Sequence, residues 1–445
     1  MAVLVRAELT GEADAAALAA RSAAAAPSAA LPTHRRAKIL SAAADAISAE
    51  SESLARLIVE EVQKPLKAAR GEAARAAATF RLAAGEAERL GGEVLPLDLD
   101  EASEGRWGLV RRFPRGPALF ITPFNFPLNL AAHKAAPAVA AGLPFVLKPD
   151  PRAVRTAARL LEILLAAGWP AEAALLATGP HEAVEALVRD DRLKILSFTG
   201  SSRVGWRLKS LSGKKHVLLE LGGSAGVYVG PDADLPWAAA RCAWGAYAYS
   251  GQTCISVQRI YVAESVHKQF RRLLVRNVEE LKVGDPSDPA TDVGPLIDED
   301  SAVRVEKWVK DALDKGAKLW AGGPRRGAIL PPALVEGVPA DSPLTCEEAF
   351  GPVALLEAVP SSDAALERIA ATRYGLQAGL FTNDLALVRR AFERLPVGGL
   401  IVNDVPTWRS DAMPYGGVND SGLGREGARW AVEEYTERRT LVVNA

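Results

Sequence analysis

The chain has few of the residues from which disulfide frameworks and metal sites are built. Its three cysteines, Cys242, Cys254 and Cys346, are too few to staple a chain of 445 residues, which favours a reducing compartment. No two of them form a Cys-x-x-Cys pair, and the five histidines never reach the spacing of metal ligands. We therefore expect no metal site.

The chain also lacks a large net charge and long apolar runs. The 53 Lys and Arg residues against 54 Asp and Glu residues give a net charge of −1, so no basic surplus indicates a nucleic-acid or membrane partner. Lys, Pro or Gly interrupts every apolar stretch before the roughly 18 residues that a membrane span needs. The N-terminus has no signal-peptide pattern. With 49% hydrophobic and 24% charged residues, we expect a globular cytoplasmic protein of enzyme size.

The length suggests about three domains, or one large discontinuous one. The first ninety residues have helical periodicity. Apolar runs rich in β-branched residues then alternate with helix-length segments, which is typical of βαβ units with a parallel sheet. We expect strands at 118–122, 144–147, 193–198 and 217–221, and helices at 127–141, 153–167 and 201–210. A second α/β region follows Tyr228, with a helix at 236–248 and strands at 259–262, 353–357 and 400–403.

Two glycine-rich segments imitate catalytic signatures. The segment 200–205 has the glycine spacing of a P-loop, but Trp206 and Arg207 follow where Lys and Ser or Thr are required. Its place between a strand and a helix suits a pyrophosphate at a helix N-terminus, and on spacing alone a plain tight turn fits as well. The segment 222–226 reads Gly-x-Ser-x-Gly, but a strand at 227–229 follows instead of the helix that a serine hydrolase needs.

Glu220 and Cys254 stand out chemically. Glu220 lies in the apolar run 217–221, where an acid is costly unless it is paired or serves as a base. Cys254 lies among small and polar residues, outside any apolar run. A single cysteine is usually a small buried hydrophobic residue, and we adopt that interpretation for Cys242 and Cys346.

The segments around Glu220 and Cys254 resemble the Glu-Leu-Gly-Gly and Gly-Gln-x-Cys motifs of the aldehyde dehydrogenase superfamily. Other motifs match in order over nearly the whole chain, at 64–67, 122–127, 145–149, 197–201, 347–353, 374–376, 414–417 and 421–426. Phe124 replaces a Trp and Asn419 a Lys, and the family's N-terminal strands look absent or shortened. The resemblance implies an α/β fold with a Rossmann-like cofactor domain (1–104 and 119–222), a catalytic domain (223–418) and a strand-based oligomerisation element (105–118 and 430–445).

The resemblance also implies the catalytic roles. Cys254 would be the nucleophile that forms a thiohemiacetal and then a thioester. Asn125 and the Cys254 backbone N–H would stabilise the oxyanion, and Glu220 would activate the water that releases a free acid. An acylating dehydrogenase or reductase of the same fold would not need Glu220. A non-catalytic structural protein of the same fold would not need Cys254, Asn125 and Glu220 intact.

For the cofactor, the resemblance implies NAD or NADP held by Thr122, Lys148, Gly200, Ser201, Val204, Glu348 and Phe350. Pro151 stands where a carboxylate commonly binds the ribose 2′-hydroxyl. Because this carboxylate is absent, no negative charge at this position repels the 2′-phosphate of NADP. The neighbouring Arg152 could assist there or be an ordinary solvated residue at a helix start.

A small aldehyde is the implied substrate, in contact with Phe126, His133, Arg409 and Tyr415. Arg409 could hold an anionic group of that aldehyde, or it could pair with Asp404 or Asp411 and stiffen its own loop. The short strands expected at 106–112 and 440–443 would pair between subunits in this family. A homodimer or homotetramer follows as the expected assembly.

Overall fold

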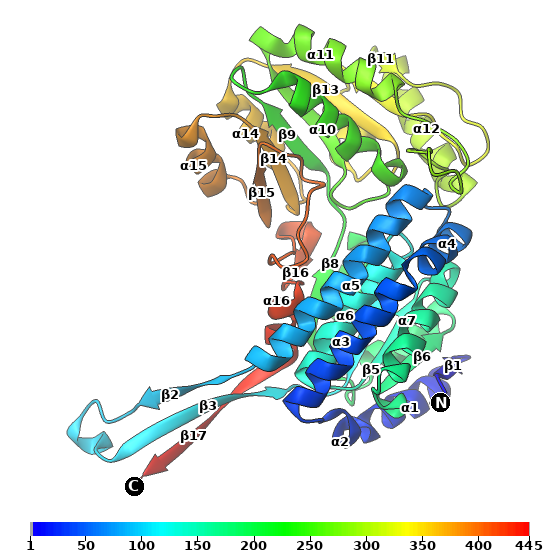
Figure 1. The fold of residues 1–445 in the computed structure, drawn as a ribbon. Helices are drawn as coiled ribbons and strands as arrows, with labels where there is room; N and C mark the ends of the chain where they lie inside the picture. The colour runs from blue at the N-terminus through cyan, green and yellow to red at the C-terminus, as the bar shows by residue number, and fades with distance from the viewer. Residues whose placement is uncertain (1–2, 445) are drawn as a thin grey trace.

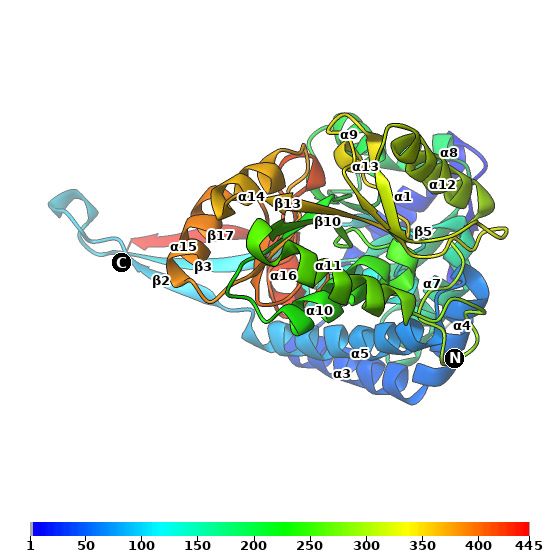
Figure 2. The same cartoon turned by 90° about the horizontal axis from the view of Figure 1, so that it is seen from above.

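Two seven-stranded sheets and a separate three-stranded sheet organise the chain in the computed structural model, which describes residues 3–444 (Figure 1). Each large sheet forms a lobe together with its covering helices, and the small sheet extends from the first lobe as a long arm. Seen from above, the arm points away from both lobes (Figure 2).

The first lobe has the strand order β1-β6-β5-β4-β7-β8-β16, which is parallel except for β16. The strands are β1 (Val5–Glu8), β6 (Ala174–Thr178), β5 (Phe145–Pro149), β4 (Ala118–Thr122), β7 (Ile195–Thr199), β8 (His216–Glu220) and β16 (Gly422–Leu423). The order β6-β5-β4-β7-β8 is that of a Rossmann-like sheet, in which the connection direction reverses between β4 and β7. This confirms the predicted fold class.

Helices cover both faces of the first sheet because its strand residues alternate between two cores. Phe120 and Leu147 pack with one set of helices, whereas Leu119 and Val146 pack with the other. The first set is α2 (Ala26–Ala29), α3 (Thr33–Ala49), α4 (Ser51–Val62), α5 (Leu66–Arg89), α6 (Pro127–Ala141), α7 (Val154–Ala166) and α16 (Ala428–Tyr435). The second is α1 (Glu12–Ala24), α8 (His181–Arg189) and α9 (Ser202–Leu211).

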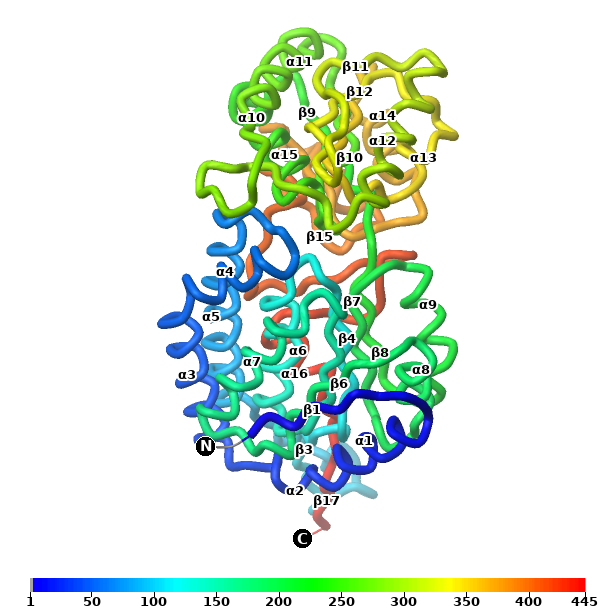
Figure 3. Tube along the Cα trace, turned by 90° about the vertical axis from the view of Figure 1, so that its right-hand side faces the viewer, coloured from blue at the N-terminus to red at the C-terminus, as the bar shows by residue number. Residues whose placement is uncertain are grey.

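The second lobe is built on the order β11-β12-β13-β10-β9-β14-β15, parallel except at β11. Its strands are β11 (Lys318–Ala321), β12 (Ala333–Glu336), β13 (Val353–Val359), β10 (Val257–Ala263), β9 (Ala225–Val229), β14 (Gln377–Phe381) and β15 (Gly399–Val402). Its helices are α10 (Leu235–Tyr247), α11 (Glu264–Glu279), α12 (Glu299–Asp314), α13 (Pro343–Cys346), α14 (Ser362–Ala370) and α15 (Leu385–Arg394). The tube in Figure 3 shows this lobe stacked above the first.

The arm contains β2 (Gly92–Pro96), β3 (Arg106–Pro114) and β17 (Thr436–Asn444) in the antiparallel order β17-β3-β2. The predicted boundary at residue 105 falls after β2, whose backbone pairs with β3 and so lies in this sheet. The N-terminal strands were expected to be absent or shortened; the structure has one short strand there, the four-residue β1, which pairs with β6 at the edge of the first sheet. Within residues 3–444, no helix has the length and hydropathy of a bilayer span.

Candidate active site

A cavity of about 1180 Å³ is lined by residues of both lobes. On the first lobe it follows the carboxyl ends of β4 and β7, where Thr122 and Thr199 lie, and the end of β8 at Glu220. In sheets of this kind ligands bind at the carboxyl ends beside the reversal of strand order. The second lobe contributes Cys254, in the segment before β10, and Glu348, in the segment before β13.

Cys254 lies in a constrained segment between α10 and β10. Tyr249, Ser250 and Gly251 have successive left-handed φ values of 50°, 56° and 71°, a conformation that non-glycine residues adopt at a cost. The Sγ atom of Cys254 lies 3.1 Å from the Oη atom of Tyr415. Burial raises the pKa of the Cys254 thiol to about 12. The thiol is therefore protonated at neutral pH and needs a base to become a nucleophile.

Glu220 has the environment of a general base. It is 4% exposed, and neither carboxylate oxygen has a hydrogen-bond partner in residues 3–444. Burial, followed by the nearby charge of Glu426, raises the pKa of Glu220 well above its ordinary value. The raised pKa makes the Glu220 carboxylate a stronger base than an exposed glutamate.

The two glycines after Glu220 are required by close approach rather than by serine chemistry. A Cβ atom on Gly222 would collide with the carboxylate of Glu348, and one on Gly223 would lie 2.5 Å from the carbonyl oxygen of Cys254. The chain then continues into β9 with no helix after Ser224. The serine-hydrolase alternative therefore lacks its structural context.

Asn125 lies in the loop between β4 and α6 and reaches the cysteine segment of the other lobe. Its Nδ2 atom donates a hydrogen bond to the Gln252 carbonyl oxygen at 3.0 Å. An amide nitrogen carries two hydrogens, so the second N–H of Asn125 remains for another acceptor. The cavity thus receives Cys254, Glu220 and Asn125 from three separate segments.

All residues that the resemblance assigned to the cofactor line this cavity: Thr122, Lys148, Gly200, Ser201, Val204, Glu348 and Phe350. Ser201 precedes α9 with extended backbone and its side chain does not cap the helix within residues 3–444, which leaves the N–H groups of the first turn available to a ligand. The hydroxyl oxygens of Thr122 and Thr199 are buried and unpaired within residues 3–444. Such unpaired donors suit the phosphate and ribose groups of a dinucleotide.

Two ionisable cofactor candidates are perturbed by burial. Burial lowers the pKa of Lys148 at the end of β5, and it raises the pKa of Glu348 to about 7. The Oε1 atom of Glu348 accepts a hydrogen bond from the Gly223 N–H at 3.1 Å. Arg152 is held by Asp150, at 3.0 Å, and by Asp298, at 3.1 Å. Two carboxylates thereby balance the positive charge of the Arg152 guanidinium.

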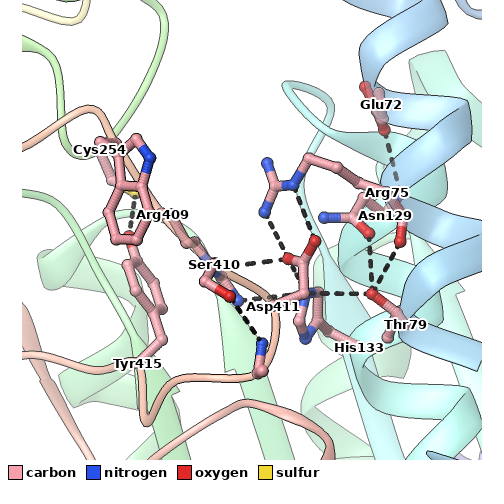
Figure 4. Close-up of polar contacts among 12 residues, drawn as sticks. Glu72, Arg75, Thr79, Asn129, His133, Cys254, Arg409, Ser410, Asp411 and Tyr415 are labelled. Carbon is pink, nitrogen blue, oxygen red and sulfur yellow. Dashed lines mark hydrogen bonds and ion pairs between the residues drawn. The ribbon is translucent and has the colours of Figure 1, made fainter. Parts of the chain in front are cut away.

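A network of charged side chains lies next to Tyr415 and Cys254 (Figure 4). The guanidinium of Arg409 stacks 3.7 Å from the ring centroid of Tyr415, and its side chain is 7% exposed. The Nη2 atom lies 3.2 Å from the His133 Nε2 atom, and the Nε atom lies 3.8 Å from the Asp411 Oδ1 atom. Arg75 donates to both oxygens of Asp411, at 3.0 and 2.6 Å. Two guanidinium groups therefore share one carboxylate.

The structure corrects the expectation for His133. This residue on α6 is fully buried and does not line the cavity. Its Nε2 atom lies 2.8 Å from the Asp411 Oδ1 atom and contacts Arg409. The helix turns its side chain toward Thr79 of α5, at 3.5 Å. Phe126, Arg409 and Tyr415 do line the cavity.

Sequence reasoning missed a polar face of α5. Glu72, Arg75 and Thr79 are three and four residues apart and therefore share one side of the helix. Glu72 and Arg75 line the cavity. Polar residues at helical spacing in an alanine-rich buried helix were the available signal. Asp404, one proposed partner of Arg409, is bound by Arg241 at 2.6 and 3.2 Å.

Comparison with known proteins agrees with this arrangement. The model of the aldehyde dehydrogenase family matches residues 2–441. The chain is 41% identical over 412 residues to a 3-sulfolactaldehyde dehydrogenase of Priestia aryabhattai, covering 92% of this chain and 86% of that protein.

Two solved structures are similar over nearly the whole chain. Aldehyde dehydrogenase 21 of Physcomitrella patens, in complex with the reaction product succinate, has a TM-score of 0.95 and 40% identity, covering 98% of this chain and 92% of that one. The glyceraldehyde-3-phosphate dehydrogenase of Methanocaldococcus jannaschii, complexed with NADP, has a TM-score of 0.94 and 37% identity, covering 98% and 95%.

Proposed function

Because this chain belongs to the aldehyde dehydrogenase family and is an NAD(P)-dependent aldehyde dehydrogenase, we propose that Cys254, Glu220 and Asn125 perform its chemistry. The observation that carries the proposal is their meeting in one cavity: a part-buried thiol, a buried carboxyl group with no hydrogen-bond partner in the described chain, and an amide with a free N–H. The cavity also has the volume and the unpaired donors that NAD or NADP requires.

In the first half of the reaction Cys254 loses its proton to a base and its sulfur adds to the aldehyde carbon. The carbonyl π pair moves to oxygen, where the Asn125 N–H and the Cys254 backbone N–H stabilise the negative charge. Bound NAD or NADP supplies the nicotinamide ring that accepts the hydride, which leaves a thioester on Cys254.

In the second half Glu220 removes a proton from a water molecule, the water oxygen adds to the thioester carbon, and the C–S bond breaks. The product is a carboxylic acid, and the sulfur recovers a proton as the thiol. The raised pKa of Glu220 supports this role, because it makes the carboxylate a stronger base toward water than an ordinary glutamate. An acylating enzyme or reductase would have no use for this buried carboxyl group.

The substrate proposed is a short aldehyde with an anionic group. Arg75 and Arg409 both line the cavity, and within residues 3–444 Asp411 is the one carboxylate that forms an ion pair with either of them, so two guanidinium groups contact one carboxylate. The relatives named above act on 3-sulfolactaldehyde or glyceraldehyde 3-phosphate, or bind succinate, and all three compounds are anionic. A loop-stiffening role alone leaves the stacking of Arg409 on Tyr415, beside the Cys254 thiol, without a purpose.

We also propose a cytoplasmic homo-oligomer. β17 pairs with β3 on one side, and no other strand of residues 3–444 pairs with its other edge along the nine residues of the strand. Leu441 and Val442 are 55% and 52% exposed on this strand. A long exposed edge with apolar side chains is a template for strand addition by a second copy. A dimer or a tetramer would cover it.

The test of the catalytic proposal is Cys254→Ser, with Cys242→Ser and Cys346→Ser as matched controls. A serine hydroxyl is a poor nucleophile here, so Cys254→Ser should oxidise no aldehyde in an absorbance assay of reduced cofactor and should still bind NAD and NADP. Both control variants should keep near-wild-type activity. Substantial turnover by Cys254→Ser would overturn the proposed mechanism.

A further inference from the structure

The ammonium group of Lys64 lies between the two segments that carry the proposed catalytic groups. Lys64 connects α4 to α5 and is completely buried. Its Nζ atom is 3.6 Å from the ring centroid of Phe126 and 4.4 Å from that of Tyr249. Phe126 directly follows Asn125, and Tyr249 precedes Cys254 by five residues. The Lys64 ammonium group thus contacts one aromatic ring in the Asn125 segment and one in the Cys254 segment.

Glu72 extends this contact to the start of α6. Its Oε2 atom accepts the hydrogen bond of the Lys64 ammonium group. Its Oε1 atom accepts from the backbone N–H groups of Leu128, at 2.9 Å, and Asn129, at 3.1 Å. The residue before α6 provides no side-chain cap, so the Glu72 carboxylate on α5 caps that helix from outside. The cap fixes the end of the loop that holds Asn125.

The second aromatic ring links the cation to the cysteine segment. Tyr249 packs edge-on against Phe126, with centroids 6.1 Å apart, and its hydroxyl donates to the Val62 carbonyl at 3.3 Å. Tyr249 has the left-handed φ of 50°, which a non-glycine residue keeps only when its surroundings hold it there. The cation, the carboxylate and the two rings are surroundings of that kind.

The pair is costly to bury, which argues for a positional role. Burial lowers the pKa of Lys64 to about 8 despite the adjacent Glu72 carboxylate. An apolar pair of similar size would fill the space without this penalty. It would have no directed contact with the N-terminus of α6, and it would not bind the faces of Phe126 and Tyr249 electrostatically.

We propose that Lys64 and Glu72 are positioning residues that hold the Asn125 amide and the Cys254 backbone in a single oxyanion-binding arrangement. The proposal rests on the proposed function, because it assigns no chemistry to Lys64 or Glu72 themselves. Neither residue needs to touch the substrate. Their loss should affect the stage at which negative charge develops on the aldehyde oxygen.

The experiment compares Lys64→Met and Glu72→Gln with Arg70→Met, a control on α5 that breaks an exposed ion pair to Glu52 of α4. A displacement of about 1 Å in an active site can lower the rate about 100-fold, so we expect kcat to fall about 10–100-fold in the first two variants. The aldehyde KM and the Kd for the cofactor should change less than about threefold. Alkylation of Cys254 by iodoacetamide, which needs no oxyanion donor, should keep its rate. Arg70→Met should behave as wild type.

A double-mutant cycle separates positioning from general destabilisation. If Lys64 acts through Asn125, then Lys64→Met should reduce kcat little further in an Asn125→Ala background. A full additional loss, or a kcat in Lys64→Met and Glu72→Gln close to wild type, would overturn the proposal. So would a loss that only follows the melting temperature. Should Lys64→Met fail to fold, the isosteric Glu72→Gln provides the same comparison.

The failures of the two proposals are distinguishable. Turnover by Cys254→Ser would remove the proposed function itself. An inactive Cys254→Ser together with full activity in Lys64→Met and Glu72→Gln would remove only the positioning role.

Discussion

Replacing Arg409 by Leu tests the anionic substrate site directly. Leu keeps the apolar bulk against the Tyr415 ring and removes the guanidinium, whose side chain is 7% exposed in the wild type. A hydrogen bond to a charged group contributes about 1.5–3 kcal/mol, and each 1.4 kcal/mol corresponds to about tenfold in affinity. We therefore expect the KM for succinic semialdehyde or glyceraldehyde 3-phosphate to rise about 10–100-fold.

Two features of the structure shape this magnitude. Arg75 keeps both contacts with Asp411 in the variant, so only the guanidinium in excess of that carboxylate is lost, and the loss should not exceed one charge-assisted contact. Arg409 also lowers the pKa of the Cys254 thiol, against the dominant effect of burial. Its removal should slow all aldehydes somewhat, so the ratio of kcat/KM between anionic and neutral aldehydes is the quantity to measure.

The assay follows reduced cofactor with succinic semialdehyde and glyceraldehyde 3-phosphate against propanal and lactaldehyde. Arg409→Lys keeps the charge without the planar fork and should lose less selectivity than Arg409→Leu. Arg276→Leu on α11, which breaks an exposed ion pair with Glu280, should lose no selectivity between the two aldehyde classes. An equal loss for both aldehyde classes in Arg409→Leu would refute the reasoning and leave Arg409 as a structural residue of its loop.

Four further results are expected. Glu220→Gln should give one rapid burst of reduced cofactor and then stall, whereas equal slow rates in both phases would place Glu220 before hydride transfer. Since burial raises the pKa of Glu220, wild-type thioester hydrolysis should accelerate as the pH rises through that pKa, and Glu220→Gln should lack this rise. Pro151→Glu should raise the KM for NADP at least tenfold while that for NAD changes little, because a carboxylate repels the 2′-phosphate; equal effects on both would place Pro151 away from that group. Light scattering should give at least twice the 47.1 kDa of one chain, and a monomer at all concentrations would contradict the strand-pairing argument.

Much of the fold follows from local patterns. The strands at 118–122, 144–147, 193–198 and 217–221 appear as β4, β5, β7 and β8, displaced by two residues at most. They were predictable because a parallel strand buried on both faces is a short continuous apolar run. β1 was missed because Val5–Glu8 alternates partly buried and exposed residues over four positions, too few for a periodic signal.

The sequence by itself determined which residues we propose to carry the chemistry. Glu220, Cys254 and Asn125 lie in motifs whose residue types and order are local properties of the chain. Only the tertiary structure decided how the charged residues are partnered. Arg75 on α5 and Arg409 meet at Asp411, although Arg75 and Asp411 are 336 positions apart in the chain.

His133 is a case in which the sequence predicted a substrate contact and the tertiary structure placed the side chain elsewhere. Its place eight residues after Asn125 suggested a substrate contact, but the orientation of α6 directs the ring behind the cavity wall. The buried contacts of Lys64 likewise depend on three segments meeting at one point. Side-chain partnership across lobes is set by packing, and packing brings together residues whose separation in sequence carries no signal.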